Sequence, residues 1–252
     1  MPEAQTQLLD ALSRDTLVLL RHHGLLRTLV SRLVTDELLE PIELDEKTRQ
    51  QAMQAYRQRN GLTTSEQLQD HCRKNGYGPA ELSRQAQLPV QIRQTSQKRF
   101  GKKAELHYLT RKEQFDLITF SQLSVSNSFL AQELFLRLKE GEAGFHELAE
   151  ELNQNDDRKG KVTIGPVPMS RLAAELTKPL RAASPGAVLE PIKVQNSWRI
   201  VRLEQFQPTQ YDEAMEQRMC LELFQQELDR LVDERIDTMT NDLVSEMNPL
   251  SA

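Results

Sequence analysis

The spacing of apolar residues changes twice along this 252-residue chain, and each change limits the folds that it can adopt. Residues 1–113 place their apolar side chains three and four positions apart, which is typical of amphipathic helices. The clearest run is Leu25, Leu26, Leu29, Val30, Leu33 and Val34. Pro41 ends the helix that carries this run, and Gly61 and Gly76 follow the ends of two later helices. We therefore expect an all-helical segment up to residue 113.

The pattern changes near residue 114. Residues 115–123 are rich in β-forming residues and alternate polar with apolar side chains, which predicts a strand. Helical spacing returns over residues 128–139, 145–152 and 172–180. Short strands are expected at 162–164, 191–194 and 198–203, the last two joined as a hairpin. Strands and helices in this order predict an α+β domain over residues 114–208.

After Pro208 the chain returns to helical spacing and stays helical to its end. One apolar stripe runs through Phe224, Leu228, Leu231, Met239 and Leu243. A long helix with such a stripe is stabilised mainly by packing, so it needs neighbours. We expect residues 209–252 to complete the helical domain of residues 1–113. The predicted fold class is thus α+β: a helical, chaperone-like domain built from both chain ends, with an α+β domain inserted.

Charge is distributed unevenly between two helical segments. Residues 211–247 contain eleven acidic residues and three arginines, whereas residues 91–112 contain seven lysines and arginines and one glutamate. Either these are two separately solvated faces, or opposite charges help the segments to pair. A third interpretation is a nucleic-acid surface on residues 93–112. The net charge of −5 and an aromatic content of 5% disfavour it.

Several site classes are unlikely from composition alone. Cys72 and Cys220 are too few for a disulfide framework or a four-cysteine zinc site. His22 and His23 are adjacent, so they diverge on a helix and lack the spacing of a chelating pair. We therefore expect no metal and no cofactor. The sequence has no 18-residue apolar run and no basic leader pattern, so we expect no membrane span and a cytoplasmic location.

Four segments of the middle region resemble, in order and spacing, the parvulin family of peptidyl-prolyl cis-trans isomerases. They are residues 120–125 (FSQLSV), 138–149 (LKEG followed by FHELA), 164–165 (IG) and 184–192 (SPGAVLEPI). The second is similar to the family's G-x-x-F-x-x-L-A segment and the fourth to its P-G-x-V-x-x-P-V turn. Residues 198–203 correspond to the last strand of the family. With its helical flanks, the chain resembles the SurA and PrsA type of parvulin-containing foldase.

The resemblance also assigns candidate site residues. Active parvulins carry one histidine on the first strand, another on the last, and a Cys or Asp between them. These positions correspond to Gln122, to Arg199 beside Trp198, and to Asn155. The proline pocket of the family uses a Leu, a Met and a Phe, which fall at Ile164, near Leu172 and near Arg181, respectively. The implied catalytic candidates are Gln122, Asn155 and Arg199; the substrate-binding candidates are Ile164, Met169, Leu172, Leu180 and Trp198.

The reaction that the resemblance implies is rotation about an X-Pro amide bond. Its barrier of about 18–20 kcal/mol reflects the loss of amide resonance, so neither a nucleophile nor a metal is needed. The expected partner is an unfolded or proline-containing polypeptide. Because both histidines are replaced, three roles stay open: weak isomerisation steered by Gln122 and Arg199, an inactive peptide-binding adaptor or holdase, and a purely structural domain.

Overall fold

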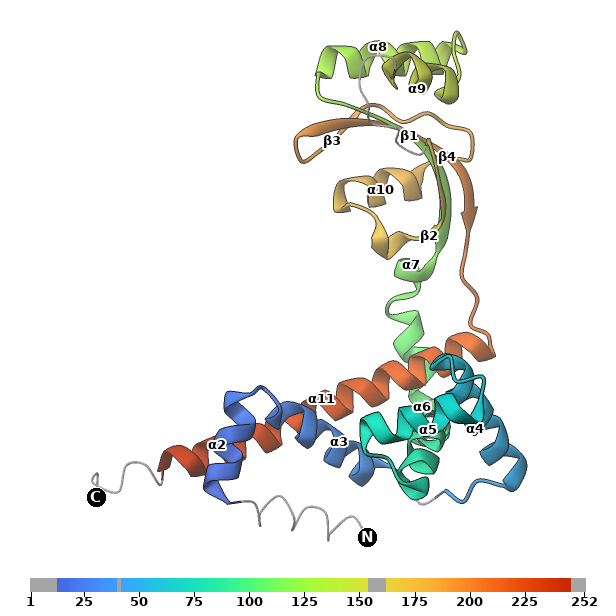
Figure 1. Cartoon of the computed structure of the whole chain (residues 1–252). Coiled ribbons are helices and arrows are strands. Elements are labelled where there is room, and N and C mark those ends of the chain that lie inside the picture. Colours follow the sequence, from blue (N-terminus) through green and yellow to red (C-terminus); the bar gives the residue numbers. More distant parts are fainter. Residues whose placement is uncertain (1–12, 40–41, 154–161, 246–252) are drawn as a thin grey trace. The chain divides into compact units, whose positions relative to one another are not determined.

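The computed structural model describes residues 13–39, 42–153 and 162–245, and divides into two compact units (Figure 1). The helical unit comprises residues 1–107 and 212–252, and the sheet unit comprises residues 108–211. The predicted fold class is confirmed, because helices from both chain ends form one unit and the intervening segment forms an α+β unit. None of the described helices is long and apolar enough to cross a membrane.

The described helices of the helical unit come from the two ends of the chain. They are α2 (Arg14–His22), α3 (Leu26–Leu38), α4 (Glu46–Arg59), α5 (Ser65–Asn75), α6 (Pro79–Leu109) and α11 (Glu213–Ser245). Local sequence sets several of their ends. The Thr64 hydroxyl accepts from Gln67 N, and the Gln67 side chain accepts from Thr64 N, so the two form a capping box at α5. Gly76 then ends α5 in the left-handed region, with φ 67°.

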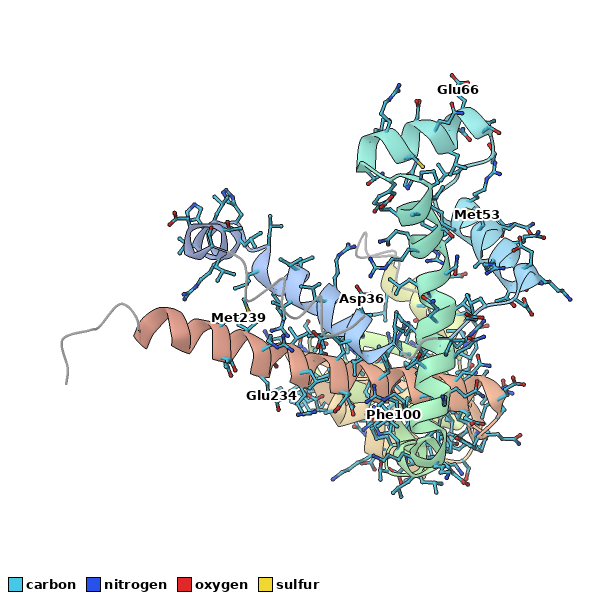
Figure 2. All side chains as sticks on the ribbon, turned by 90° about the horizontal axis from the view of Figure 1, so that it is seen from below. Asp36, Met53, Glu66, Phe100, Glu234 and Met239 are labelled. Carbon is cyan, nitrogen blue, oxygen red and sulfur yellow. The ribbon has the colours of Figure 1, made fainter. Side chains whose placement is uncertain are left out.

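The core of the helical unit lies along the seam between α3 and α11. The apolar stripe of α3 meets the stripe of α11, and the buried members are Leu26, Val30, Val34, Leu38, Phe224, Leu228 and Val232. Met239 packs against the same cluster from farther along α11 (Figure 2). Ion pairs flank the seam: Arg27 Nη1 lies 2.6 Å from Asp233 Oδ1, and Arg235 Nη2 lies 3.3 Å from Glu37 Oε2. The long C-terminal helix therefore has the packing partner that its stripe required.

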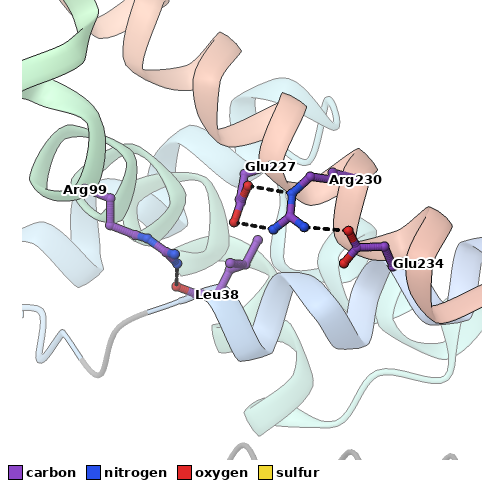
Figure 3. A network of polar contacts seen from close by, with 5 residues as sticks. All are labelled: Leu38, Arg99, Glu227, Arg230 and Glu234. Atoms are coloured by element: carbon purple, nitrogen blue, oxygen red, sulfur yellow. Dashed lines mark hydrogen bonds and ion pairs between the residues drawn. The ribbon is translucent and has the colours of Figure 1, made fainter.

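Charged groups of α6 lie close to carboxylates of α11 (Figure 3). Arg230 donates to both carboxylate oxygens of Glu227, at 2.9 and 3.1 Å, and to Glu234 at 2.6 Å. These hydrogen bonds lower the pKa of Glu227, and the nearby charges of Arg99 and Lys103 lower it further. Arg99 also donates to the carbonyl of Leu38, at 3.2 Å. Part of the basic stretch thus faces acidic residues within its own unit.

The sheet unit is built from one small antiparallel sheet with helices on both faces. Its elements are α7 (Lys112–Phe115), β1 (Leu117–Val125), α8 (Ser128–Glu140), α9 (Phe145–Asn153), β2 (Thr163–Pro168), the 3₁₀ helix η1 (Met169–Arg171), α10 (Ala174–Ala182), β3 (Ile192–Val194) and β4 (Ser197–Gln207). The strand order is β2-β1-β4-β3. The first and last strands of the chain therefore lie side by side at the centre of the sheet.

Each face of this sheet has its own apolar core. On one face, Leu123, Val125 and Ile200 pack against α8 and α9 (Figure 1). On the other, Ile118, Phe120, Val201 and other strand residues pack against Leu176 and Leu180 of α10. We call these the α8/α9 face and the α10 face. Because side chains alternate along a strand, β1 and β4 each contribute to both cores.

Candidate functional site

Gln122 and Arg199 lie on the α10 face, on the two central strands. Gln122 of β1 pairs with Val201 of β4, and Val201 belongs to the core of that face. Arg199 is two residues before Val201, so its side chain leaves the sheet on the same side. The two candidates are therefore diagonal cross-strand neighbours, which long side chains can bridge. The structure brings together two positions that are 77 residues apart in sequence.

The polar groups of these two side chains have no partners among the described residues. The backbone N–H of Gln122 donates to Val162 O at 2.8 Å, but its side-chain amide makes no hydrogen bond within the described chain. Arg199 makes no ion pair there either, and its Nε is buried without an acceptor. Both side chains are half-buried. Hydrogen-bonding capacity is thus held at this face and left unused by the fold.

The apolar candidates divide into surface and core. Ile164 of β2 pairs with Phe120 of β1 and is half-buried. Leu172, which follows η1, is also half-buried. Met169 and Leu180 also belong to the core of the α10 face, but they are only 2% and 0% exposed. Ile164 and Leu172 can therefore contact a bound molecule directly, whereas Met169 and Leu180 support the surface from beneath.

Trp198 does not share this surface. It precedes Arg199 on β4 and packs against the core of the α8/α9 face. The cause is the two-residue repeat of a strand, which sends adjacent side chains to opposite faces. Asn155 lies outside the described residues. Arg181, near the expected phenylalanine position, donates through Nη2 to the carbonyl of Glu113 at 2.6 Å, which ties α10 to α7.

Further apolar residues of the α10 face were not expected as site residues. Leu189, Ile192 and Phe206 are half-buried and pack against its core. Ile192 pairs with Arg199 across β3 and β4, so it lies directly beside the guanidinium-bearing residue. The alternation of side chains along a strand could have identified Ile192, because Ile192 and Val194 lie on either side of the exposed Lys193. Leu189 precedes β3, so no strand repeat marks it.

Four polar residues of the opposite face, Ser121, Thr163, Arg202 and Glu204, interact with one another. Ser121, 3% exposed, donates to Glu204 Oε1 at 2.6 Å and lies 3.3 Å from the Thr163 hydroxyl. Arg202 Nε donates to the same Glu204 oxygen at 2.9 Å, and its guanidinium lies over the Phe145 ring, 5.1 Å from the centroid. The negative charge of Glu204 is thus paired with Arg202 and accepts from Ser121, so this cluster contributes to the stability of the sheet.

The arrangement on the α10 face suits the binding of a peptide. It combines hydrogen-bond donors with half-buried apolar side chains, and rotation about an amide bond needs no nucleophile. No cluster of three or more His, Cys, Asp or Glu that could hold a metal occurs among residues 13–39, 42–153 and 162–245. The hydrogen-bond donors and half-buried apolar side chains of this surface can support recognition and electrostatic steering.

Comparison with known proteins identifies the sequence of the sheet unit. Residues 100–216 match the PPIC-type PPIase domain, a peptidyl-prolyl cis-trans isomerase family, and so cover the whole sheet unit. No curated protein matches the chain.

Several solved structures are similar at low identity. Peptidylprolyl isomerase (PrsA) from Bacillus anthracis is 15% identical, with a TM-score of 0.43, over 86% of this chain and 97% of that one. Foldase protein PrsA from Streptococcus pneumoniae is 16% identical, with a TM-score of 0.41, over 90% and 79%. A SurA-like chaperone from Campylobacter jejuni is 16% identical, with a TM-score of 0.36, over 85% and 92%.

Proposed function

Because residues 100–216 belong to the PPIC-type PPIase domain family, we propose that this chain is a foldase that binds proline-containing segments of unfolded or precursor polypeptides. The binding surface is the α10 face. The observation that carries the proposal is the pairing of unused hydrogen-bonding groups, on Gln122 and Arg199, with half-buried apolar side chains, Ile164 and Leu172, on one face. An unfolded segment offers backbone carbonyls that can accept hydrogen bonds from these groups. Its proline ring can pack against the apolar side chains, which is favourable because apolar surface leaves water.

Isomerisation by this surface would act on the twisted amide. As the X-Pro bond rotates, resonance is lost and the imide nitrogen regains a lone pair that accepts a hydrogen bond. A donor that reaches this nitrogen only in the twisted state lowers the barrier, because it stabilises the transition state more than the ground state. Arg199 and Gln122 both carry N–H donors. We expect only modest acceleration of cis-trans exchange, because this chain has Gln122 and Arg199 where the active parvulins that it resembles have histidine.

The alternative is a peptide-binding adaptor or holdase without isomerase activity. It uses the same surface and differs only in whether the bound amide rotates faster. A cytoplasmic location and the absence of nucleic-acid binding stay predictions from the sequence.

The deciding experiment is magnetisation-transfer NMR on short X-Pro peptides, with and without the full chain. We expect faster cis-trans exchange with the wild-type chain and loss of the acceleration in the double variant Gln122→Ala/Arg199→Ala. The matched control is Gln132→Ala/Arg137→Ala, which removes the same two residue types from α8, away from the α10 face.

Peptide binding, followed by chemical-shift changes in the same samples, separates the outcomes. Binding without acceleration in a folded chain supports the adaptor or holdase. Absence of both binding and acceleration for every peptide would show that the proposed function is wrong.

A further inference from the structure

Arg199 differs from three other arginines of the sheet unit in having no carboxylate partner. Those three pair with carboxylates within the unit: Arg137 with Glu151, Arg181 with Glu113, and Arg202 with Glu204. The buried Nε of Arg181 also lacks an acceptor, but its Nη atoms are engaged. Arg199 pairs with no described residue, and its buried Nε has no acceptor. Its cross-strand neighbours, Ser124 on β1 and Ile192 on β3, carry no charge. A permanent positive charge is therefore held half-buried beside apolar groups, without a counter-charge in the described chain.

This state is costly unless a bound molecule relieves it. A guanidinium stays protonated throughout the physiological range, so it cannot escape burial by losing its charge. An unsatisfied buried N–H favours any bound group that supplies an acceptor. A carboxylate is the best match, because its two oxygens fit the planar guanidinium fork and its charge is opposite.

The place of Arg199 on the sheet limits where that carboxylate can lie in a client. Ile164 and Arg199 sit on strands at either side of β1, about 10 Å apart across the sheet. Their partners on β1, Phe120 and Ser124, are four residues apart, or about 13 Å along the strand. The two positions are therefore about 16 Å apart, which an extended chain spans with about five residues, so a client whose proline contacts Ile164 can place an acidic residue near Arg199 when that residue lies up to about five positions from the proline.

We infer that Arg199 makes the α10 face selective for clients with a glutamate or aspartate up to about five residues from the proline. The inference rests on the proposed function, because it assumes that the α10 face holds a proline-containing segment. It adds the class of client and assigns Arg199 as the residue that determines the preference.

The test compares the full chain's affinity for paired fluorescent peptides by anisotropy. Each peptide has one proline and no charged side chain apart from the tested one. Each pair carries Glu or Gln at a single position, up to about five residues before or after the proline. In at least one pair we expect the Glu peptide to bind about fivefold tighter, the size of a partly exposed ion pair, and added salt to reduce the difference.

Variants assign the preference to Arg199. Arg199→Gln should bind both members of the pair equally. Arg199→Glu should instead favour a Lys peptide over the Gln peptide. Arg137→Gln, the same substitution on α8, should keep the wild-type preference.

A measurement on the wild-type chain tests the inference even if a variant fails to fold. The Arg199 Nε–H resonance should shift on addition of the Glu peptide and much less with the Gln peptide. If proline peptides bind but no pair discriminates, or if Arg199→Gln keeps the preference, the inference is wrong and the proposed function stands. If no proline peptide binds at all, both are wrong.

Discussion

The two faces of the sheet differ in how completely their polar groups are paired. On the α8/α9 face, Ser121 and Arg202 both donate hydrogen bonds to Glu204, and the Ser121 hydroxyl also lies within hydrogen-bond distance of the Thr163 hydroxyl. On the α10 face, Gln122 and Arg199 have no side-chain partner among the described residues. Ser121 and Gln122 are adjacent on one strand, so chain position does not explain the difference. The α8/α9 face pairs these polar groups with one another, whereas the α10 face leaves Gln122 and Arg199 without a partner among the described residues.

The largest expected effect tests whether the α8/α9 face carries the stability of the sheet unit. Leu148 of α9 is 0% exposed in that core, so Leu148→Ala should lower the free energy of unfolding by about 3 kcal/mol. Leu172→Ala removes a half-buried side chain from the α10 face and should cost about 1 kcal/mol while weakening peptide binding. Urea denaturation and peptide titration measure the two effects. Equal losses of stability would remove the distinction between the faces.

A smaller difference is expected for the adjacent residues Ser121 and Gln122. Ser121→Ala removes a hydrogen bond to the Glu204 carboxylate in a buried site, so it should cost about 1–2 kcal/mol. Gln122→Ala breaks no side-chain hydrogen bond with a described residue, so the free energy of unfolding should change by less than about 0.5 kcal/mol. Peptide affinity should respond in the opposite order. Exposed Ser124→Ala is the control for a serine on the same strand; a stability loss in Gln122→Ala as large as in Ser121→Ala contradicts the comparison.

The helical unit offers a paired network whose contribution depends on pH. Hydrogen bonds from Arg230 lower the pKa of Glu227, so ionised Glu227 stabilises the fold above its ordinary pKa. This contribution is lost as the pH falls through the lowered pKa. Glu227→Gln should therefore destabilise the chain by less than about 1 kcal/mol at neutral pH, and the difference from wild type should shrink at an acidic pH below the ordinary glutamate pKa. Urea denaturation at both pH values measures this, with exposed Asp237→Asn on the same helix as control. A difference that grows on acidification would contradict the assignment.

The smallest expected effect leaves stability unchanged and compares two thiols of the helical unit. Cys220 is 0% exposed, and burial raises its pKa, whereas Cys72 is half-buried on α5. An aromatic disulfide reagent at neutral pH should modify Cys72 in the native protein and Cys220 only after denaturation, because reaction needs an accessible thiolate. Cys72→Ser, which leaves Cys220 alone, should abolish the native reaction. Rapid native reaction of that variant would show that the α6–α11 region opens readily.

Much of the fold followed from periodicity, and the family resemblance supplied the candidate site residues. The stripe of Phe224 and Leu228 required a packing partner, and the structure supplies α3. The placement of Gln122 and Arg199 on one face also obeys strand alternation. The same rule separates Trp198 from Arg199, since neighbours on a strand face opposite ways, and pattern matching to a family overlooked it.

Other features of the site depend on distances that no local pattern contains. Met169 and Ile164 were equal candidates by resemblance, yet one is buried in the core and the other reaches the surface. Burial of this kind depends on how η1 and α10 pack onto the sheet. The engagement of Arg181 with Glu113 likewise joins residues 68 apart in the chain. Such contacts arise from packing, which sequence spacing does not encode.

By itself, the sequence determined the order of helices and strands, the inserted arrangement of the two units and the family of residues 100–216, because hydrophobic periodicity and motif order are local properties of the chain. Only the tertiary structure decided which charges are neutralised. Arg202 and Arg199 are three residues apart and have the same side chain, but the first meets Glu204 and the second meets no carboxylate among the described residues. The physical reason is that pairing depends on what the fold brings within hydrogen-bond distance, and that distance is set across strands.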